Sequence, residues 1–363
     1  MDKQSKIYIA GHTGLVGTAI KKELENQGYT NLVFRTFSEL DLTDQLQAEA
    51  FFRYEKPEYV FLAAAKVGGI HANNTYRADF IYENLMIQNN VIHQAYKAGV
   101  KKLLFLGSTC IYPKQAQQPI KEEYLLTDEL EYTNEPYAIA KIAGIKMCES
   151  YNLQYNTNFI SVMPTNLYGK GDNFNLETSH VLPALMRKIH LGKCLEQNDW
   201  QSIRKDLKSY PVGDLKNNSS EIEILEKLKK IGISSDQNKG KVEIWGSGKP
   251  LREFLWSEDM ANACVYIMQN IDFGSLISKD FQLKKDIKNT HINIGSGEEI
   301  SIKDLAYLIK KKLNFKGELY FNADKPDGTP RKLIDVSKLN NLGWEAKVKL
   351  ERGVEELYKW YLG

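Results

Sequence analysis

The chain has 363 residues, 42% of them hydrophobic, and its 48 basic and 46 acidic residues leave a formal net charge of +2. Such a mixed, nearly neutral charge does not create a field that recruits nucleic acid or an anionic membrane, so neither partner is expected. The length and the hydrophobic content suit one large α/β unit or two domains with a real core.

The cysteines and the N-terminus indicate a compartment. No CxxC pair and no metal-ligand spacing joins the four cysteines, so no metal site is predicted and a reducing environment is favoured. An apolar signal region is absent, and no apolar run reaches the roughly 18 residues that a membrane helix needs. We therefore expect a cytoplasmic protein.

The chain opens with a strand, a glycine-rich turn and a helix. Residues 6–10 form a short apolar run, the GxxGxxG turn of residues 11–17 follows, and residues 18–27 have a helical pattern. Glycines let the backbone approach a pyrophosphate, which then lies at the helix N-terminus. The turn predicts dinucleotide binding, and the alternative is a glycine turn that only packs the helix against the strand.

The second strand, residues 32–35, ends in Arg35-Thr36-Phe37. An NAD enzyme of this type usually has an acid here that binds the ribose 2′-hydroxyl. A cation instead favours a 2′-phosphate, so we predict NADP(H), with a solvated surface arginine as the alternative. Asp41 and Leu42 are expected to flank the adenine.

Strands and helices continue to alternate up to residue 170. Residues 58–65 predict a buried strand followed by a loop, residues 78–98 a long helix, and residues 158–164 another strand. The strand at residues 101–107 ends in Ser108-Thr109-Cys110, and ligands bind at the carboxyl ends of strands in open α/β sheets. The alternation predicts an α/β fold with a doubly wound parallel sheet of the Rossmann type.

The next helix contains Tyr137 and Lys141. Pro136 suits the first helical position, Asn134 suits the cap, and the helix is expected to run to about residue 155. Residues four apart share a helical face, so the Lys141 ammonium is expected to stabilise the phenolate and lower the Tyr137 pKa from about 10. Tyr307 and Lys311 have the same spacing, but no other candidate catalytic residue is near them in the sequence, so they are expected on a solvated helix face.

Beyond residue 171 the pattern is less regular, as expected where substrate-binding segments interleave with cofactor-domain strands. We predict an NADP-binding Rossmann domain in residues 1–170, to which later segments return, and a smaller substrate domain mainly in residues 171–363. The polar residues 196–239, with a helical run at 221–230, predict a surface insertion. Further elements are expected at residues 180–191, 242–245, 256–270, 291–294, 301–313 and 317–321.

A family pattern extends over seven segments: residues 11–17, 63–70, 107–113, 134–141, 162–169, 245–254 and 325–332. Together they resemble the GDP-L-fucose synthase family of extended short-chain dehydrogenases. They match in order and at compatible spacing over nearly the whole chain, except at residues 196–239. Members epimerise C3 and C5 of a GDP-4-keto-6-deoxy-mannose and then reduce C4, so the resemblance implies a GDP-sugar substrate and NADP(H). Related enzymes pair through the helices expected here at residues 78–98 and 137–155, which implies a homodimer.

The resemblance also implies catalytic roles. Inverting a carbon next to a ketone requires one group to remove the α-proton and another to deliver a proton to the opposite face. By resemblance, Cys110 is the base and His180 the acid, while Ser108, Tyr137 and Lys141 steady the enolate oxygen. In the reduction, Tyr137 protonates the C4 oxygen. Without the resemblance, we would interpret Cys110 as a core thiol and His180 as an ordinary helix histidine.

Two sets of ligand residues follow. Arginine and lysine can pair with a diphosphate and a tryptophan can pack against a ring; by resemblance the GDP-sugar is held by Lys188, Trp245, Arg252, Asp327 and Lys332. Taken singly, Trp245 suits a core position equally well and Lys188 a solvated face. The residues expected at the cofactor are Gly11, Thr13, Gly14, Leu15, Val16, Gly17, Arg35, Phe37, Asp41, Leu42, Leu106, Ser108, Lys141, Pro164, Asn166, Leu167 and His180.

The chain departs from the family in two places. Thr13 and Phe37 stand where a member of the family has arginines near the 2′-phosphate, so the NADP preference rests on Arg35 and the missing acid. Residues 196–239 lie between His180 and Trp245 in the sequence, in a position to change which GDP-sugar is accepted, including a heptose.

Several alternatives remain open. The nearest are a GDP-4-keto-heptose epimerase/reductase and a simple 4-ketoreductase. A sugar dehydratase, or a 4-epimerase that retains its NAD, is less well supported, because a dehydratase has an acid pair where this chain has Cys110-Ile111. A silent NADP(H)-binding regulator belongs to a different class and does not need the whole set Ser108, Cys110, Tyr137, Lys141 and His180.

Overall fold

The computed structural model describes residues 1–216, 218–237, 239–282 and 286–363. It divides into two compact units, each built from separated stretches of chain. Unit 1 comprises Met1–Gly169, Glu253–Glu298 and Leu333–Val348, and unit 2 comprises Lys170–Arg252, Glu299–Lys332 and Lys349–Gly363.

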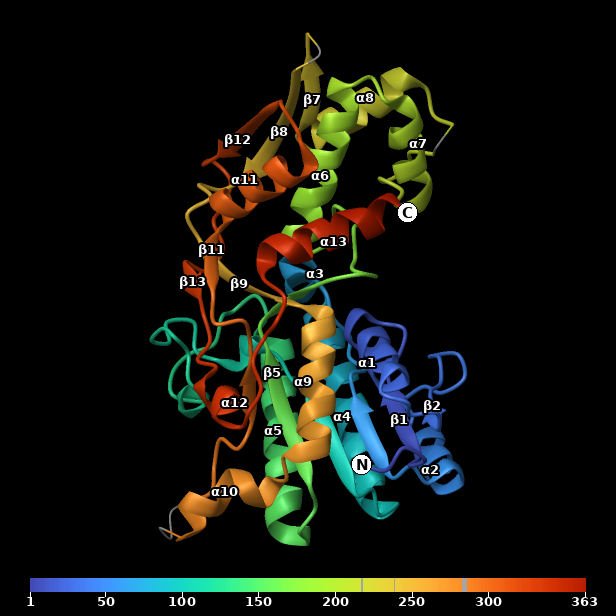
Figure 1. The fold of residues 1–363 in the computed structure, drawn as a ribbon, viewed down its shortest axis with the longest axis vertical. Coiled ribbons are helices and arrows are strands. Elements are labelled where there is room, and N and C mark those ends of the chain that lie inside the picture. The colour runs from blue at the N-terminus through green and yellow to red at the C-terminus, as the bar shows by residue number, and fades with distance from the viewer. Residues whose placement is uncertain (217, 238, 283–285) are drawn as a thin grey trace. The chain divides into compact units, whose positions relative to one another are not determined.

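Unit 1 is built on a six-stranded parallel sheet (Figure 1). Every neighbouring pair in this sheet is parallel. The strands have the order expected of a doubly wound sheet, which confirms the predicted Rossmann-type fold. In spatial order they are β2 (Leu32–Val33), β1 (Ile7–Ala10), β3 (Tyr59–Leu62), β4 (Lys102–Leu106), β5 (Phe159–Pro164) and β10 (Ile292–Ile294).

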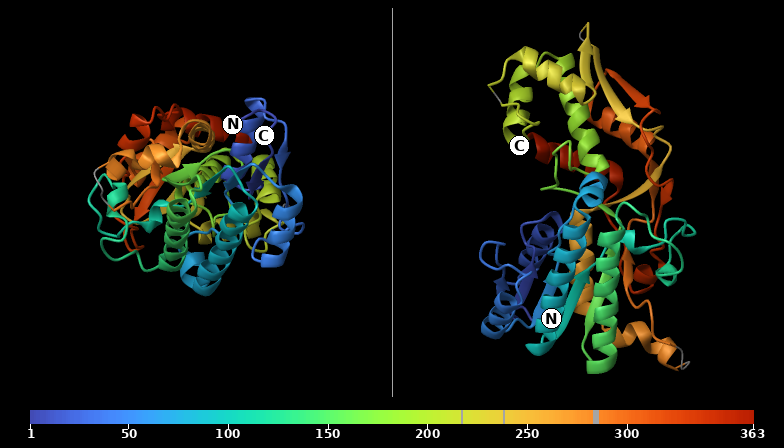
Figure 2. Two further views of the ribbon diagram at one scale, coloured as in Figure 1. Left: turned by 90° about the horizontal axis from the view of Figure 1, so that it is seen from below. Right: turned by 180° about the vertical axis from the view of Figure 1, so that it is seen from behind.

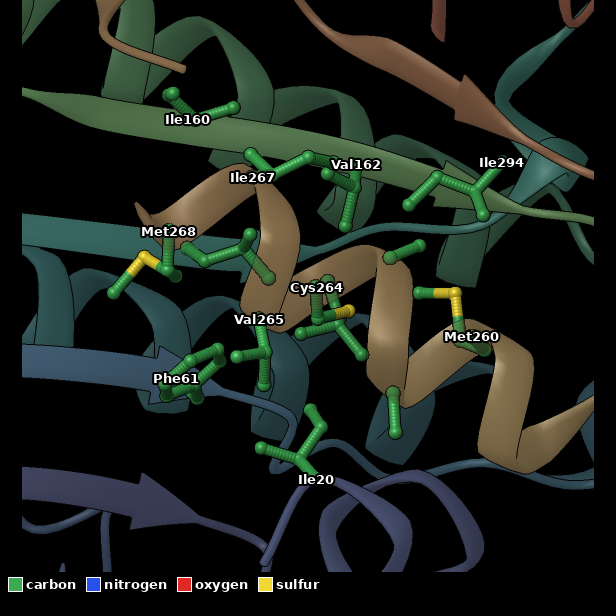
Figure 3. Packing of buried hydrophobic residues seen from close by; sticks show 14 of the residues in the cluster. Ile20, Phe61, Ile160, Val162, Met260, Cys264, Val265, Ile267, Met268 and Ile294 are labelled. Carbon is green, nitrogen blue, oxygen red and sulfur yellow. The ribbon is translucent and has the colours of Figure 1, made fainter. Parts of the chain in front are cut away.

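Helices cover both faces of this sheet (Figure 2). One face packs against α1 (Leu15–Asn26) and α9 (Ser257–Asn270), and the other packs against α2 (Gln45–Glu55), α4 (Arg77–Lys97) and α5 (Glu135–Tyr155). Figure 3 shows the first core, in which Cys264 and Val265 of α9 lie with Phe61 and Val162 of the sheet. Cys264 is therefore a core residue and packs as a small hydrophobic side chain does.

The remaining elements of unit 1 are short and lie mainly in connections. β9 (Leu251–Trp256) crosses from one unit to the other, and its residues 254–256 pair in parallel with β6 (Asn166–Tyr168) in unit 1. The others are α3 (Ile70–Thr75), η1 (Thr109–Ile111), η2 (Glu122–Tyr124), α10 (Phe273–Gln282) and α12 (Ser337–Asn341).

Unit 2 contains a three-stranded sheet in the order β12 (Glu318–Asn322), β8 (Lys239–Trp245) and β7 (Ile233–Asp236). The start of β9 pairs with β13 (Arg331–Lys332), and β11 (Glu299–Ser301) lies on its other side. The helices of this unit are α6 (Val181–Glu196), α7 (Trp200–Ser209), α8 (Glu221–Lys230), α11 (Ile302–Leu313) and α13 (Leu350–Leu362).

Residues 196–239, which are predicted as a surface insertion, contain two helices with a core of their own. Helices α7 and α8 bury an apolar stripe at helical spacing in a local core, and the predicted run at 221–230 is α8. Asp206 of α7 is buried and pairs with the fully buried Arg187 of α6, with 2.8 Å between Nη2 and Oδ1. Charged residues on the outer faces of these helices make the stripe hard to recognise in the sequence. The segment is part of the fold of unit 2. Residues 217 and 238 lie outside the described residues.

Several boundaries differ from those expected. β2 ends at Val33, so Arg35 lies in the loop that follows, and α1 starts at Leu15 rather than at residue 18. Asn134 occupies the cap position of α5, but its side chain makes no capping hydrogen bond with any described residue, and Pro136 is the second residue of the helix. None of the helices in the described part of the chain is both long and apolar enough to span a membrane.

Candidate cofactor, catalytic and substrate site

The glycine turn has the geometry of a phosphate cradle. Gly11 has φ +83°, and a Cβ added there would lie 2.7 Å from the backbone nitrogen of Ala64. A Cβ on Gly17 would lie 2.1 Å from the Gly11 carbonyl oxygen, so only glycine permits this close approach. No described side chain caps α1, whose first residues are Leu15 and Val16. Their backbone N–H groups at the helix N-terminus suit a dinucleotide pyrophosphate.

Arg35 is an anchored side chain rather than a solvated charge. Its Nη2 donates to Glu55 Oε1 at 2.6 Å, and its Nη1 donates to the Phe34 carbonyl at 2.8 Å. The guanidinium carbon also lies 5.7 Å from the centre of the Phe51 ring. Arg35, Phe51 and Glu55 line a pocket that begins at the end of β2. This pocket is the candidate place for the adenosine end of a nicotinamide dinucleotide.

Two side chains near this place, His12 and Lys21, were not predicted. His12 stacks on Phe34 with 4.7 Å between ring centres, and Lys21 Nζ lies 4.5 Å from the centre of the same ring. Burial, and then the charge of Lys21, lowers the pKa of His12. Only the fold brings the glycine turn, α1 and the end of β2 together here. Phe37, which was expected at the cofactor, has 78% of its surface exposed.

Four predicted catalytic residues lie together at the carboxyl end of β4. Ser108 Oγ accepts a hydrogen bond from the Cys110 backbone nitrogen at 3.4 Å and caps η1, the short turn that contains the buried Cys110. Lys141 Nζ donates to the carbonyl of Leu106, the last residue of β4, at 2.9 Å. Cys110 lies near enough to Tyr137 and Lys141 for its negative form to raise the pKa of both.

The expected lowering of the Tyr137 pKa by Lys141 is wrong for this structure. Burial, followed by the charge of Cys110, raises the pKa of Tyr137. Lys141 Nζ is 5.7 Å from the centre of the Tyr137 ring and is held by the Leu106 carbonyl. Burial also lowers the pKa of Lys141 to about 8. Helical spacing brings the two residues close, but removal from water is the main influence on the pKa of each.

The remaining expected cofactor residues lie around the same sheet. Asn166 Nδ2 donates to the Glu253 carbonyl at 2.8 Å, which holds β6 against β9. The Leu42 carbonyl accepts from Asn90 Nδ2 at 2.9 Å, and Asp41 Oδ1 accepts from the Thr43 nitrogen at 2.8 Å. Thr13, at the tip of the glycine turn, is exposed. Pro164 ends β5, Leu106 ends β4, and Gly14 and Leu167 lie in the glycine turn and in β6.

Unit 2 contains His180 and the predicted substrate residues. His180 is the N-cap residue of α6, and loss of hydration, followed by the charge of Lys332, lowers its pKa. Lys332 on β13 lies opposite Arg252 on β9. Trp245 at the end of β8 has 64% of its surface exposed, so it is not a core residue. His180 and Arg252 are thus each related to Lys332 within the unit.

Hydrogen bonds fix the loop between β12 and β13 in unit 2. Asp327 accepts from the backbone nitrogen and the hydroxyl of Ser247, at 2.9 and 2.6 Å. Arg252 Nη1 donates to the Thr329 carbonyl at 2.6 Å. Lys188 Nζ donates to the Glu243 carbonyl at 2.8 Å, and burial lowers its pKa to about 8, so this lysine is not a solvated face. Asp327 thus orders the loop, and the cations Lys188, Arg252 and Lys332 lie on α6, β9 and β13.

Comparisons with known proteins extend over the whole chain. The description "NAD dependent epimerase/dehydratase family" belongs to the family that matches residues 7–207 and 223–295. GDP-L-fucose synthase 1 of Arabidopsis thaliana is 52% identical over 361 residues, covering 99% of this chain and 94% of that protein. GDP-L-fucose synthase of Escherichia coli (strain K12) is 47% identical over 362 residues, covering 100% of this chain and 98% of that protein.

A solved structure gives the same picture. The GDP-mannoheptose C4 reductase from Campylobacter jejuni, solved with NADP bound, is 48% identical to this chain. Its fold matches with a TM-score of 0.87 and covers 99% of each chain. The likeness therefore includes both compact units.

Proposed function

Since this chain belongs to the NAD dependent epimerase/dehydratase family, we propose that it converts a GDP-4-keto-sugar in two stages. It epimerises C3 and C5 of a GDP-4-keto-6-deoxy-mannose and then uses NADPH to reduce C4, giving GDP-L-fucose or a close analogue. The observation that carries the proposal is the grouping of Ser108, Cys110, Tyr137 and Lys141 at one end of β4. Names of full-length relatives support the choice of substrate.

Epimerisation needs a base, an acid and stabilisation of a developing enolate. A thiolate is a competent base near neutral pH, and the nearby Lys141 ammonium favours negative charge at Cys110. His180 then returns a proton to the opposite face of the sugar carbon. Tyr137 and Ser108 donate hydrogen bonds to the enolate oxygen, which strengthen as charge builds there.

Reduction uses the same tyrosine as a proton donor. NADPH, when bound, supplies hydride to C4 of the ketone. Tyr137 gives its phenolic proton to the C4 oxygen, and its raised pKa keeps the phenol protonated in advance of that step. Lys141 keeps its ammonium at neutral pH, because its pKa is about 8, and stabilises the phenolate that results.

The cations of unit 2 suit the diphosphate of the substrate. Arg252, Lys188 and Lys332 provide positive charge, and the exposed indole of Trp245 offers a flat apolar face. The pKa of His180 is lowered in the absence of ligand. Burial is the larger cause and the charge of Lys332 the smaller one. A diphosphate anion beside Lys332 offsets that charge and so favours the protonated form that the acid role requires.

A test of the proposal is incubation with NADPH and a panel of GDP-4-keto-sugars in D₂O, followed by NMR of the products. We expect deuterium at C3 and C5 and consumption of NADPH with a 6-deoxyhexose. Stoichiometric cofactor binding without turnover of any sugar would contradict the proposal and favour a silent NADP(H)-binding regulator.

A heptose substrate is the second candidate. It is supported by the 48% identity with the GDP-mannoheptose C4 reductase and by the structured segment between α6 and β8. The same panel distinguishes the candidates through kcat/KM for the 6-deoxyhexose and the heptose. Reduction of a heptose without deuterium at C3 or C5 identifies a simple 4-ketoreductase.

Arg35→Ala is expected to weaken NADPH binding about 10- to 100-fold more than NADH binding. A hydrogen bond between a guanidinium and a phosphate contributes about 1.5–3 kcal/mol, and only NADPH has the 2′-phosphate. Fluorescence titration of both cofactors measures the two dissociation constants. Arg53→Ala, an exposed arginine on α2, is the control and should change neither constant. Equal losses for both cofactors, or a parent that prefers NADH, would show the assignment wrong.

We propose a homodimer that pairs through α4 and α5, which lie side by side on one face of unit 1 (Figure 2). A second copy suits this surface because both helices expose large apolar side chains: Tyr82, Ile139, Leu153 and Tyr155 are 61%, 42%, 49% and 42% exposed. Light scattering at micromolar concentration is expected to give twice the chain mass. Leu153→Glu should give a monomer, whereas Leu46→Glu on the exposed surface of α2 should not. A parent protein that is monomeric at this concentration would contradict the proposal.

We also propose a cytoplasmic location. The structure describes all four cysteines and joins none of them by a disulfide, and all four are buried. That usage suits a reducing compartment. Fractionation of cells that express the tagged full chain tests this location, and recovery with membranes or outside the cell would contradict it.

A further inference from the structure

The turn that contains Cys110 is weakly held by its own backbone. It is a three-residue 3₁₀ helix, and its hydrogen bonds are long: 3.3 Å from the Ile111 nitrogen to the Ser108 carbonyl, and 3.5 Å from the Tyr112 nitrogen to the Thr109 carbonyl. A base that removes a carbon-bound proton must nevertheless be placed within a fraction of an ångström. Other contacts must therefore fix this turn.

Tyr112, the residue directly after the turn, has such contacts. Its side chain is buried, and its hydroxyl donates to Asn293 Oδ1 at 2.6 Å and lies 2.9 Å from His291 Nε2. Asn293 lies in the edge strand β10 and His291 directly precedes that strand. Both are about 180 residues from Tyr112 in the sequence. The ring thus ties the Cys110 turn to the edge of the sheet.

The protons of this network have one consistent arrangement. A phenol has a single proton, and Tyr112 gives it to Asn293, so His291 must donate from Nε2. Burial, followed by the charges of Lys338 and Lys146, lowers the pKa of His291 to about 3, and the imidazole is therefore neutral. Its Nδ1 is buried and bonds to no described residue. The Tyr112 oxygen is thus the hydrogen-bond partner of this ring.

Further hydrogen bonds fix the partners of Tyr112. Asn293 Nδ2 donates to the Ile120 carbonyl at 3.0 Å, and the Asn293 backbone nitrogen donates to Glu122 Oε1, also at 3.0 Å. Lys338 Nζ donates to the His291 carbonyl at 2.7 Å. Apart from His291 Nδ1, the polar side-chain atoms named in this network are hydrogen-bonded. Buried bonds of this kind hold their partners in place, because breaking one costs far more than it does in water.

We propose that Tyr112, through His291 and Asn293, is a positioning residue that holds the Cys110 turn in place for proton transfer at the sugar carbon. The inference rests on the proposed function. It differs from a purely stabilising role because it predicts damage to one half of the reaction only: the base sits on the turn, whereas the proton donor for reduction, Tyr137, sits on α5.

Tyr112→Phe removes the hydroxyl and retains the ring. We expect solvent deuterium exchange at C3 and C5 to fall about 10- to 100-fold, while reduction of a pre-epimerised ketone changes by less than about twofold. Tyr29→Phe is the matched control, since Tyr29 is also buried and its hydroxyl also has two partners, Met1 and Gln269, in the core on the other face of the sheet. It should leave both rates within about twofold.

A folded Tyr112→Phe protein that exchanges deuterium like the parent, or that loses both activities equally, overturns the inference. If Tyr112→Phe does not fold, His291→Gln, which keeps an N–H donor, and His291→Leu, which does not, replace it. Exchange retained by a folded His291→Leu is then the contradicting result.

A second measurement is independent of the sugar. The rate at which iodoacetamide alkylates Cys110, followed by peptide mass spectrometry, should change several-fold in Tyr112→Phe and not in Tyr29→Phe. A parent that exchanges no deuterium contradicts the proposed function, and the alkylation rate alone then decides the positioning role: an unchanged rate overturns it.

Discussion

Tyr137→Phe is expected to lower NADPH-dependent reduction by about 10²- to 10⁴-fold, the usual contribution of a positioned acid. The variant keeps the ring and loses only the hydroxyl. Tyr137 lies beside Lys141 and Cys110, and its raised pKa keeps the phenol protonated, so it is suited to protonate the C4 oxygen. Some solvent deuterium exchange at C3 or C5 should remain, since Cys110 still removes the α-proton.

The chain provides a matched control for this variant. Tyr307 and Lys311 have the same spacing on α11, and 45% of the Tyr307 surface is exposed. Tyr307→Phe should leave both activities unchanged. NADPH absorbance and NMR in D₂O, recorded on the same samples, separate the two steps. Loss of exchange together with reduction in Tyr137→Phe would mean that Tyr137 acts in both steps equally.

Cys110→Ser is expected to have the opposite effect, slowing deuterium exchange at C3 and C5 by about 10²-fold or more. A thiol has a pKa of about 8.5, whereas a hydroxyl is a far poorer base at neutral pH. Reduction should survive, so the variant should consume NADPH with a pre-epimerised ketone or reduce the unepimerised ketone to a different sugar.

Cys148→Ser is the control for this second variant. Cys148 is a buried thiol on α5, and burial raises its pKa to about 12, so it cannot supply a thiolate near neutral pH. Its replacement should not change exchange in protein that remains folded. If Cys110→Ser exchanges deuterium as fast as the parent, Cys110 is a structural thiol and the chain is better described as a simple 4-ketoreductase.

The features that the sequence predicted correctly are those that depend on neighbouring residues. The Gly11 to Gly17 turn, the apolar strands and the helix around Tyr137 follow from backbone preferences and from side-chain periodicity over a few residues. Because parallel strands bring their carboxyl ends to one edge of the sheet, where ligands bind, the sequence also predicted that Ser108 and Cys110 lie at that edge. These features do not depend on contacts between residues far apart in the sequence.

For residues 196–239, the local pattern predicted a surface insertion but not the buried contacts that the segment makes. Most residues of α7 and α8 are polar and only a few are buried, so the composition predicted a surface insertion. The Arg187 and Asp206 pair, which joins α6 to α7 inside the core, became visible only in three dimensions. Whether a charged residue is buried depends on what packs over it, and its own neighbours in the sequence do not contain that information.

By itself, then, the sequence determined the fold class, the glycine turn and the chemical types that meet at the end of β4. Only the tertiary structure decided the electrostatics: Tyr137 has a raised pKa because surrounding atoms remove water, and Arg35 is held by Glu55 from another element. It also decided the bond between Tyr112 and Asn293, 181 residues apart. Hydration and long-range pairing are properties of the packed chain, whereas periodicity is a property of a short segment.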